Sequence, residues 1–454
     1  MTNKLKHRLW LAFAKLLDYF SVSLPFFICW FYYYSNVIIN PFYRMGNFII
    51  AILYVFVFGY LCRVYDADEI SLHRISEVFY SQILSFLVAD GFIYLLICVL
   101  SRRLVNLIPG LMCIAAQFVI ALAWSYFVHL WYFKSFPAKK TIIVYDNQQD
   151  MENLINEYGL DKKFDVHKIC QIDECIENIS ILEEYQTVFL SDIHSHERNI
   201  ITKYCVAHDK DVYIVPRLGD IILSGARNMH MFHLPILRLR SYNPHLEYVI
   251  MKRLFDILVS LVALVLFSPF MIITAVFIKL YDNGPVFYKQ NRLTMHGKVF
   301  SILKFRSMRV DAEKFTGAVL SAGDNDPRIT PVGKVIRKIR FDELPQLINI
   351  LKGDMSIVGP RPERPEIAKE YEKTLPEFSL RLQAKAGLTG YAQVYGKYNT
   401  TPYNKLQMDL MYIAHPSFIE DLRICMATVK ILFMKESTEG VENYNVTQHN
   451  EKDD

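Results

Sequence analysis

Residues 252–279 read KRLFDILVSLVALVLFSPFMIITAVFIK, and this stretch decides where the rest of the chain lies. The run is apolar, Lys252-Arg253 and Lys279 make both flanks basic, and Ser268-Pro269 interrupts the middle. Proline breaks or kinks a helix, and neither half is long enough to cross a hydrocarbon core of about 30 Å. The stretch therefore predicts a re-entrant helix over 254–279 with both ends on one membrane face. A kinked spanning helix fits the same features equally well.

Four further apolar runs precede it within residues 1–135. They are Phe13–Tyr34, Phe48–Cys62, Val78–Leu100 and Leu107–Phe133. A helix that crosses a bilayer needs about 20 apolar residues. We therefore expect a membrane α-helical bundle of four spans over 1–135. The helices of a soluble bundle are a poorer interpretation because these runs carry so few charges.

The basic residues between the runs predict the orientation. With a cytoplasmic N-terminus, the outside loops carry Arg44, Arg102 and Arg103. The inside segments carry Lys4, Lys6, Arg8, Arg63, Arg74, Lys134, Lys139 and Lys140. Basic residues concentrate on the cytoplasmic side of membrane proteins. An even number of spans then places everything after about residue 135 on the cytoplasmic face of the membrane.

Composition excludes several other classes. The chain has 454 residues, of which 52% are hydrophobic, and a formal net charge of +4. This excludes a disordered chain and argues against a nucleic-acid partner. The eight cysteines are scattered without a CxxC pair, which fits small apolar side chains in a reducing compartment and not a disulfide framework or a zinc site.

Residues 139–240 change character and predict a small α/β domain of Rossmann type. Short β-branched runs at Thr141–Tyr145, Val166–Cys170, Thr187–Leu190 and Val212–Val215 alternate with helical stretches. The first turn, residues 146–150, reads DNQQD and lacks the glycines that let a backbone approach a pyrophosphate. We therefore expect an accessory domain that binds no nicotinamide or flavin. Its expected role is contact with another copy of the chain, as a homo-oligomer, or with the catalytic domain.

Two basic stretches follow the re-entrant run. The first comprises Lys289, Arg292, Lys298, Lys304, Arg306 and Arg309, and the second Arg328, Lys334, Arg337, Lys338 and Arg340. Such residues can contact anionic lipid headgroups. They can equally line a site for a phosphorylated substrate, and among them Arg292, Lys304, Arg306 and Arg337 are candidate substrate-binding residues. Charge alone does not separate the two interpretations.

Residues 340–347, RFDELPQL, carry the sharper signal. Apolar residues at 344, 347, 348 and 351 have helical spacing, which predicts a helix that begins at Asp342 or Glu343. Two carboxylates at a helix start can simply cap it. Adjacent carboxylates can also hold Mg²⁺ beside substrate phosphates, and a carboxylate there can attack phosphorus. Residues 353–362, GDMSIVGPRP, then present Arg361 between two prolines, either as a phosphate ligand or as part of a structural turn.

Several ordered motifs from Lys252 to about residue 435 resemble the bacterial sugar transferase family, the monotopic polyprenyl-phosphate phosphoglycosyl transferases. They are KRLFDILVSLVALVLFSP, GPVFYKQNRL with GKVFSILKFRSM, DPRITPVGKVIRKIRFDELPQLINILKGDMSIVGPRPERPE, and AGLTGYAQVYG. The N-terminal part resembles the long-form members that start exopolysaccharide, capsule or O-antigen repeat units. One departure is Thr294, where family members often have glycine, and it puts the geometry of that turn in question.

The resemblance implies a membrane-associated α/β catalytic domain over 250–435, followed by a polar tail over 436–454. It implies that Asp342 is the nucleophile, that Glu343 is its partner, and that Asp342 helps to hold Mg²⁺. Ser268-Pro269 would be the re-entrant break, and Arg361 a phosphate or nucleotide contact. The implied reaction transfers a sugar-1-phosphate from a UDP-sugar to undecaprenyl phosphate and releases UMP, on the cytoplasmic face of a bacterial inner membrane.

Two rival functions remain open at this stage. A glycosyltransferase that releases UDP often uses a DxD pair, and Asp324-Asn325-Asp326 has that shape, although a loop explains it as well. A non-enzymatic membrane scaffold of a polysaccharide assembly complex is the other, and the intact Asp342, Glu343 and Arg361 argue against it.

Overall fold

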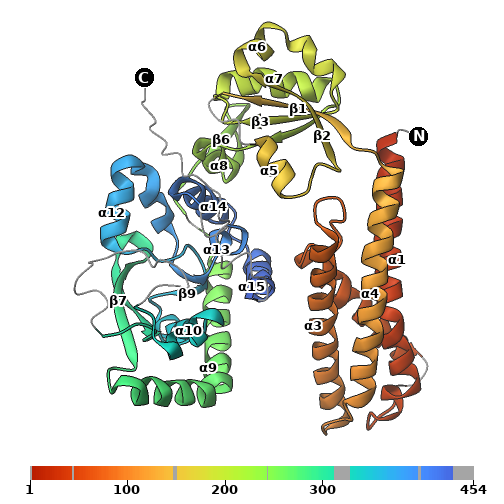
Figure 1. Ribbon diagram of the computed structural model, residues 1–454, viewed down its shortest axis with the longest axis vertical. Coiled ribbons are helices and arrows are strands. Elements are labelled where there is room, and N and C mark those ends of the chain that lie inside the picture. Colours follow the sequence, from red (N-terminus) through yellow and green to blue (C-terminus); the bar gives the residue numbers. More distant parts are fainter. Residues whose placement is uncertain are drawn as a thin grey trace. The chain divides into compact units, whose positions relative to one another are not determined.

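The computed structural model describes residues 3–42, 45–146, 151–242, 244–310, 328–396 and 400–432. The chain forms two compact units, Met1–Pro216 and Arg217–Asp454 (Figure 1). Residues 217–240, which the sequence grouped with the α/β domain, belong to the second unit. The turn at 147–150, the Asp324-Asn325-Asp326 triplet and the tail over 436–454 lie outside the described residues.

The N-terminal unit begins with four long apolar helices. They are α1 (Asn3–Tyr32), α2 (Met45–Val64), α3 (Ile75–Ser101) and α4 (Ile108–Ser135), with the short 3₁₀ turn η1 (Tyr34–Asn36) after α1. Each is long and apolar enough to cross a membrane. Their outward faces are apolar, as Phe20, Ile52 and Val119 show with 61%, 68% and 64% exposure. Inside, Gln82 donates to the Asp18 carboxylate at 2.9 Å, and Ser125 donates to Gln82. An apolar outside and polar contacts inside are typical of membrane helices.

A four-stranded parallel sheet follows in the same unit. Its elements are β1 (Lys139–Tyr145), α5 (Met151–Glu157), β2 (Phe164–Gln171), α6 (Ile172–Glu177), the 3₁₀ turn η2 (Ile179–Glu184), β3 (Thr187–Ser191), α7 (Ser195–Ala207) and β4 (Asp211–Ile214). The strand order is β2-β1-β3-β4, and every neighbouring pair is parallel. Strand β1 is buried from Thr141 to Val144, as a central parallel strand requires. The predicted parallel α/β arrangement is confirmed.

The C-terminal unit combines short sheets with many helices. Its first elements are α8 (Leu218–Ser224), β5 (Arg227–Met231), β6 (Leu234–Arg238), α9 (Leu246–Asp282), β7 (Phe287–Leu293), η3 (Met295–Gly297), β8 (Val299–Phe305), α10 (Pro331–Lys338) and η4 (Phe341–Glu343). The remaining elements are α11 (Gln346–Lys352), β9 (Ser356–Val358), α12 (Pro365–Thr374), η5 (Pro376–Gln383), β10 (Gly387–Thr389), α13 (Tyr391–Tyr395), α14 (Pro402–Ala414) and α15 (Phe418–Leu432). Strands β5-β6 and β7-β8 pair antiparallel, whereas β9 and β10 pair in parallel. The main core lies where α11, β9 and α14 meet, around Leu347, Ile357 and Leu406.

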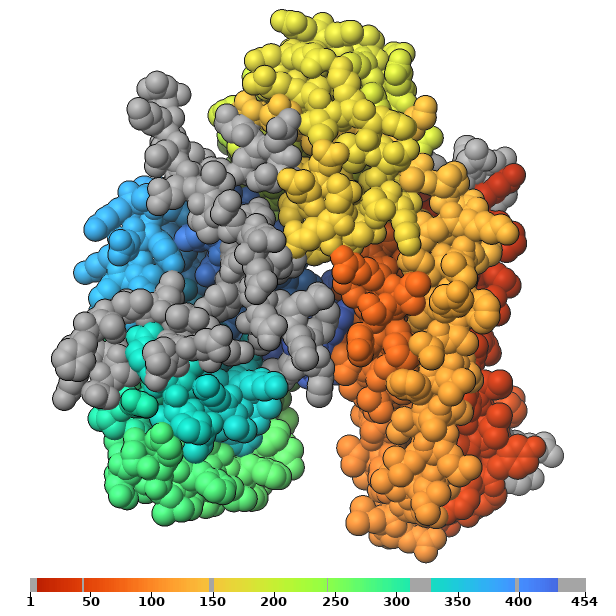
Figure 2. Space-filling model, viewed as in Figure 1, coloured from red at the N-terminus to blue at the C-terminus, as the bar shows by residue number. Residues whose placement is uncertain are grey.

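Helix α9 is bent, and both of its segments pack on this one unit (Figure 1). Before Pro269, Phe255 and Val259 contact the main core; after it, Met271 and Ala275 contact a second core around Phe305. A straight helix of this length would extend about 55 Å and could not fold back onto both cores. The other face of α9 stays apolar and exposed, and its side chains form a continuous surface at the lower end of the unit (green in Figure 2).

Candidate active site

The acidic pair Asp342-Glu343 lies in the 3₁₀ turn η4, between α10 and α11. The expected helix start at Asp342 or Glu343 is wrong, because α11 begins at Gln346 after Pro345. Pro345 has no N–H to offer the Phe341 carbonyl, and the N–H of Leu344 donates to that carbonyl instead. The N-cap positions are Arg340 for η4 and Pro345 for α11, and neither side chain makes a capping bond. Asp342 and Glu343 therefore do not occupy an N-cap position.

Aromatic contacts hold this turn in place. The ring of Phe341 stacks on Phe305 of β8, with 6.5 Å between centroids, and meets Phe267 of α9 edge to face at 6.4 Å. Phe267 immediately precedes Ser268-Pro269, where Ser268 donates to the Val265 carbonyl at 2.8 Å. The acidic turn is therefore fixed against the part of α9 that bends.

Glu343 is held by two cations. Lys304 Nζ lies 2.7 Å from its Oε1, and Arg361 Nη2 lies 3.3 Å from the same atom. Burial on its own would raise the pKa of Glu343, but the charges of Lys304 and Arg361 lower it well below its usual range. Glu343 is therefore ionised throughout the neutral range, and it positions both cations.

Asp342 has the opposite environment. Burial and the neighbouring Glu343 raise its pKa to about 6, although Lys304 and Arg337 act in the other direction. Among the described residues, none forms an ion pair with its carboxylate. Two adjacent carboxylates thus differ sharply: Glu343 is fixed in ion pairs, whereas Asp342 is uncommitted and titrates close to neutrality. Environments that push two pKa values apart are typical of groups with different chemical roles.

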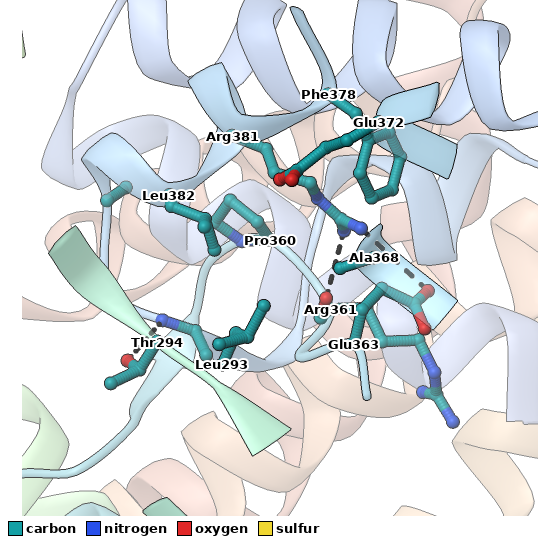
Figure 3. Close-up of a pocket in the computed structure, with 12 residues that line it drawn as sticks. Leu293, Thr294, Pro360, Arg361, Glu363, Ala368, Glu372, Phe378, Arg381 and Leu382 are labelled. Atoms are coloured by element: carbon teal, nitrogen blue, oxygen red, sulfur yellow. Dashed lines mark hydrogen bonds and ion pairs between the residues drawn. The ribbon is translucent and has the colours of Figure 1, made fainter. Parts of the chain in front are cut away.

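The backbone around Arg361 is fixed from two sides. Arg292 of β7 donates to the Pro362 carbonyl at 2.9 Å. Arg381 of η5 donates to the Arg361 carbonyl at 2.9 Å (Figure 3). Gly359 permits a close approach here, because a Cβ would lie 2.2 Å from the Lys385 carbonyl. With its backbone held, the Arg361 side chain reaches Glu343 and remains 45% exposed.

Sequence reasoning missed the buried pair behind this turn. Arg381 and Asp409 are 3% and 1% exposed and lie 2.7 Å apart, and Glu363 lies 3.8 Å from the same guanidinium. Arg381 also lines a cavity of about 10 Å³, room for roughly one water molecule. Asp409 lies in an ordinary amphipathic helix, α14, and its position in the sequence gives no signal that it pairs with a residue 28 positions earlier.

The structure places the other predicted residues as follows. Lys304 lies at the acidic turn, and the charge of Arg337 acts on Asp342. Arg292 holds the backbone of the proline turn. Arg306 is buried and pairs with Asp282, and its Nε donates to the Pro285 carbonyl at 2.7 Å. Because both ends of this guanidinium are occupied, Arg306 secures the end of α9, and we assign it no ligand.

Thr294, where the family resemblance leads us to expect glycine, adopts an unstrained backbone conformation. Its φ of −130° suits any residue. Its buried hydroxyl donates to the Asp354 carbonyl at 3.0 Å and accepts from the Ala386 N–H at 3.2 Å. The threonine therefore links β7 to the loops that precede β9 and β10.

The described residues fit a Mg²⁺ ion that takes a single protein carboxylate, that of Asp342. No group of three or more His, Cys, Asp or Glu side chains suited to a metal occurs among the described residues. Mg²⁺ usually takes only one or two carboxylates and completes its shell with water and substrate phosphates. Asp342 is the member of the acidic pair that forms no ion pair with the described residues, so it fits this role.

A family model and several known proteins match this chain in sequence. The model of the family described as bacterial sugar transferase matches residues 247–435. The UDP-N-acetylgalactosamine-undecaprenyl-phosphate N-acetylgalactosaminephosphotransferase of Aeromonas hydrophila is 37% identical over 244 residues, which is 53% of this chain and 56% of the relative. The UDP-glucose:undecaprenyl-phosphate glucose-1-phosphate transferase of Xanthomonas campestris is 37% identical over 233 residues, 50% of this chain and 48% of the relative.

The chain thus spans about half the length of these two relatives. A third, the exopolysaccharide production protein PSS of Rhizobium leguminosarum, is 40% identical over 189 residues, which is 40% of this chain and 94% of the relative. This match covers nearly all of that shorter protein. The residues that match the family model, 247–435, include Asp342, Glu343 and Arg361. The chain belongs to the bacterial sugar transferase family.

Proposed function

We propose that this protein transfers a sugar-1-phosphate from a UDP-sugar to undecaprenyl phosphate, with release of UMP. The observation that carries the proposal is the contrast between Asp342, uncommitted with a pKa of about 6, and Glu343, fixed by Lys304 and Arg361. The relatives are named for different sugars, N-acetylgalactosamine and glucose, and share transfer to undecaprenyl phosphate. That shared chemistry is the part we assign to this chain.

The reaction would proceed in two displacements at one phosphorus atom. A carboxylate oxygen of Asp342 attacks the β-phosphorus of the UDP-sugar, and the bond from this phosphorus to the bridging oxygen breaks, so that UMP leaves with the electron pair. A phosphate oxygen of undecaprenyl phosphate then attacks the same phosphorus, and the bond to Asp342 breaks. The products are undecaprenyl diphosphate-sugar and free Asp342.

The neighbouring residues would prepare this chemistry. Ionised Glu343 holds Lys304 and Arg361 beside Asp342, where both cations can bind the phosphoryl oxygens. Arg361 is 45% exposed, so its fork of donors can reach a substrate. Bound Mg²⁺, held by Asp342 and the diphosphate, would supply further neutralisation of phosphate charge.

The membrane arrangement supports the same proposal. We infer that α1–α4 cross the bacterial inner membrane with the N-terminus in the cytoplasm, and that α9 enters the bilayer and returns to the cytoplasmic face. The exposed apolar face of α9 lies on the same unit as the acidic turn, and Phe267 of α9 contacts Phe341. A long-chain lipid phosphate could therefore reach Asp342 while its chain stays in the membrane.

A nucleotide-release assay tests the proposal. Purified full-length protein in detergent is incubated with undecaprenyl phosphate, Mg²⁺ and each member of a panel of UDP-sugars, and the released nucleotide is identified by chromatography. UMP release that requires Asp342 is expected, with Glu370→Gln, an exposed carboxylate of α12, as the matched control for Asp342→Asn. Release of UDP would indicate glycosyl transfer instead, and absence of any nucleotide release across the panel would favour a scaffold.

A further inference from the structure

A second candidate site lies at the end of the N-terminal bundle, where α1 begins and α4 ends. A cavity of about 490 Å³ is lined by Lys6, His7, Trp10, Trp131, Ser135 and Phe136. Helices α1 and α4 run side by side here (Figure 1). The volume is within the usual range of small-molecule sites, about 300–1,000 Å³. None of these residues takes part in the proposed reaction.

The walls of this cavity are built and fixed. The His7 ring meets Phe136 edge to face at 4.4 Å, and its Nε2 lies 3.3 Å from the hydroxyl of Tyr132, which is 5% exposed. Trp131 meets Phe136 edge to face at 5.9 Å. The aromatic floor therefore does not need to rearrange in order to receive a ligand.

The membrane arrangement proposed above would place the cavity at the depth of lipid headgroups. Helix α1 has 30 residues and is about 45 Å long, whereas the hydrocarbon core of a bilayer is about 30 Å thick. The helix is therefore longer than the hydrocarbon core, and its start, which carries the charged Lys6 and Arg8, is the end that would extend into the headgroups. Trp10, which is 53% exposed, and Trp131 are residues that prefer this interface.

Charge favours an anion in this cavity. Lys6 lines it and is exposed. Lys139 and Lys163 lie close enough for their charges to act on His7, with Asp211 as the opposing charge. Asp211 pairs with Lys139 at 2.5 Å, and both Glu69 and Asp211 oppose the charge of Lys163. The positive charge that the cavity wall itself presents is that of Lys6, and a negatively charged headgroup would complement it.

An apolar track leads from the cavity along the bundle. Phe13 and Leu17 follow Trp10 at helical spacing on α1 and are 54% and 45% exposed. Phe127, one turn before Trp131 on α4, is 65% exposed. These side chains continue from the aromatic cavity toward the hydrocarbon, as the chain of a lipid would.

We propose that this cavity binds an anionic phospholipid, with its phosphate at Lys6 and His7 and its acyl chain along Phe13, Leu17 and Phe127. The site belongs to the N-terminal unit alone, and the proposal does not depend on the reaction assigned to Asp342. A lipid at this position would anchor the start of α1 to the end of α4.

Tryptophan fluorescence tests this proposal, because the chain has four tryptophans and two of them line the cavity. Purified full-length protein in detergent is titrated with brominated phosphatidylglycerol or brominated phosphatidylcholine, since bromine quenches nearby indoles. Brominated phosphatidylglycerol is expected to quench saturably, at concentrations at least fivefold lower than those at which brominated phosphatidylcholine quenches. Trp10→Phe and Trp131→Phe should remove most of the quenching, whereas Trp30→Phe, at a fully buried position, should retain it.

Charge variants complete the test. Lys6→Gln should weaken the phosphatidylglycerol effect about fivefold, the value of one basic residue at an anionic surface. Arg8→Gln, exposed two residues further on the opposite side of α1, should leave it unchanged. The proposal would be overturned if both lipids quenched equally or if Lys6→Gln and Arg8→Gln had equal effects. It would also be overturned if inorganic phosphate displaced the brominated lipid at concentrations similar to those of the lipid.

Discussion

Lys304 Nζ lies 2.7 Å from Oε1 of Glu343, and this contact joins strand β8 to the acidic turn η4. Both side chains are largely buried, at 20% and 15% exposure. Burial of a charge is costly unless a partner compensates it. The pair therefore fixes the position of a cation beside Asp342, and each member depends on the other.

The first prediction concerns Glu343→Gln. The amide keeps the shape but leaves Lys304 without its anion, which should destabilise the C-terminal unit by about 1–2 kcal/mol. UMP release should fall by at least tenfold because Lys304 and Arg361 lose their common anchor. Thermal unfolding and nucleotide release are measured on the same preparation. If Glu343→Gln keeps full activity, the positioning role is wrong.

The second prediction separates the chemistry of Asp342 from its effect on stability. Its pKa is raised in the folded protein, to about 6. Between the pKa of Asp342 in the unfolded chain and about 6, the folded state binds more protons than the unfolded state. The contribution of Asp342 to the free energy of unfolding therefore decreases as pH rises through about 6. Asp342→Asn removes the buried charge and should match or exceed wild-type thermal stability at pH 8, with a smaller difference at pH 5.

Activity should respond in the opposite way. Asp342→Asn should lose UMP release to background, since an amide is a poor nucleophile for phosphorus. In the wild-type protein, single-turnover release should fall as pH decreases through about 6, because protonation removes the nucleophile. Normal release by well-folded Asp342→Asn, or a rate independent of pH from 5 to 8, would rule out the covalent mechanism.

The third prediction concerns the buried pair Arg381–Asp409. Arg381→Met alone leaves Asp409 uncompensated and should cost about 3–5 kcal/mol of stability. The double variant Arg381→Met with Asp409→Leu should recover most of that stability, since an apolar pair can replace a buried ion pair. Neither variant retains the bond to the Arg361 carbonyl, so the double variant should remain impaired in KM for the UDP-sugar.

Recovery of both stability and KM in the double variant would show that Arg381 acts only through packing. Arg381→Lys serves as the conservative variant. A lysine can keep the charge beside Asp409 but lacks the fork of donors that reaches Asp409 and the Arg361 carbonyl together. It should therefore retain more stability than Arg381→Met, with KM still raised.

The fourth prediction concerns Thr294, whose hydroxyl bonds Asp354 and Ala386. Thr294→Val keeps the volume but leaves a buried carbonyl and a buried N–H without this partner, which should cost about 1–3 kcal/mol. Thr294→Ser keeps the hydroxyl and should cost less. Thermal unfolding of the two variants side by side measures the difference. Equal stability of valine and serine variants would show that the two bonds contribute little.

The sequence predicted the elements that depend on local pattern. Long apolar runs correctly predicted the helices α1–α4, and β-branched runs correctly predicted the parallel strands. Both signals can be recognised within a single segment, because burial determines where its apolar residues recur. The helix start was predicted at Asp342 or Glu343, with Pro345 tolerated in the first turn, whereas α11 begins only after this proline. A local sequence pattern does not show that the Phe341 carbonyl must accept a hydrogen bond from the N–H of Leu344 instead of from residue 345.

The sequence identified the acidic pair of the candidate site, but it did not show which basic residues lie beside that pair. Lys304, Arg306 and Arg337 look equivalent in a basic stretch, yet Lys304 meets Glu343 whereas Arg306 meets Asp282. Alternation along a strand does not separate them, because residues two apart point to the same face. Strand β8 ends at Phe305, so Arg306 lies beyond it, where the strand pattern no longer applies. Pairs such as Arg381–Asp409 depend on how η5 and α14 pack, and no single-segment pattern encodes that contact.

The last prediction concerns the membrane topology of α9. Both ends of the helix are tied to the same unit: Lys252 pairs with Asp421 of α15 at 2.9 Å, and Asp282 pairs with Arg306, which follows β8. A helix that crossed the bilayer would separate these anchors by the thickness of the membrane, about 30 Å. We therefore expect both ends on the cytoplasmic face.

Cysteine labelling on intact cells with a membrane-impermeant maleimide measures this directly. Lys298→Cys, exposed between β7 and β8, should label only after the cells are permeabilised. Arg103→Cys, exposed after α3 in a loop predicted to face outward, should label on intact cells and serves as the matched control. The eight native cysteines provide the background, which the unsubstituted protein measures. Labelling of Lys298→Cys on intact cells would mean that α9 spans the membrane, and the site around Asp342 would then face away from cytoplasmic nucleotides.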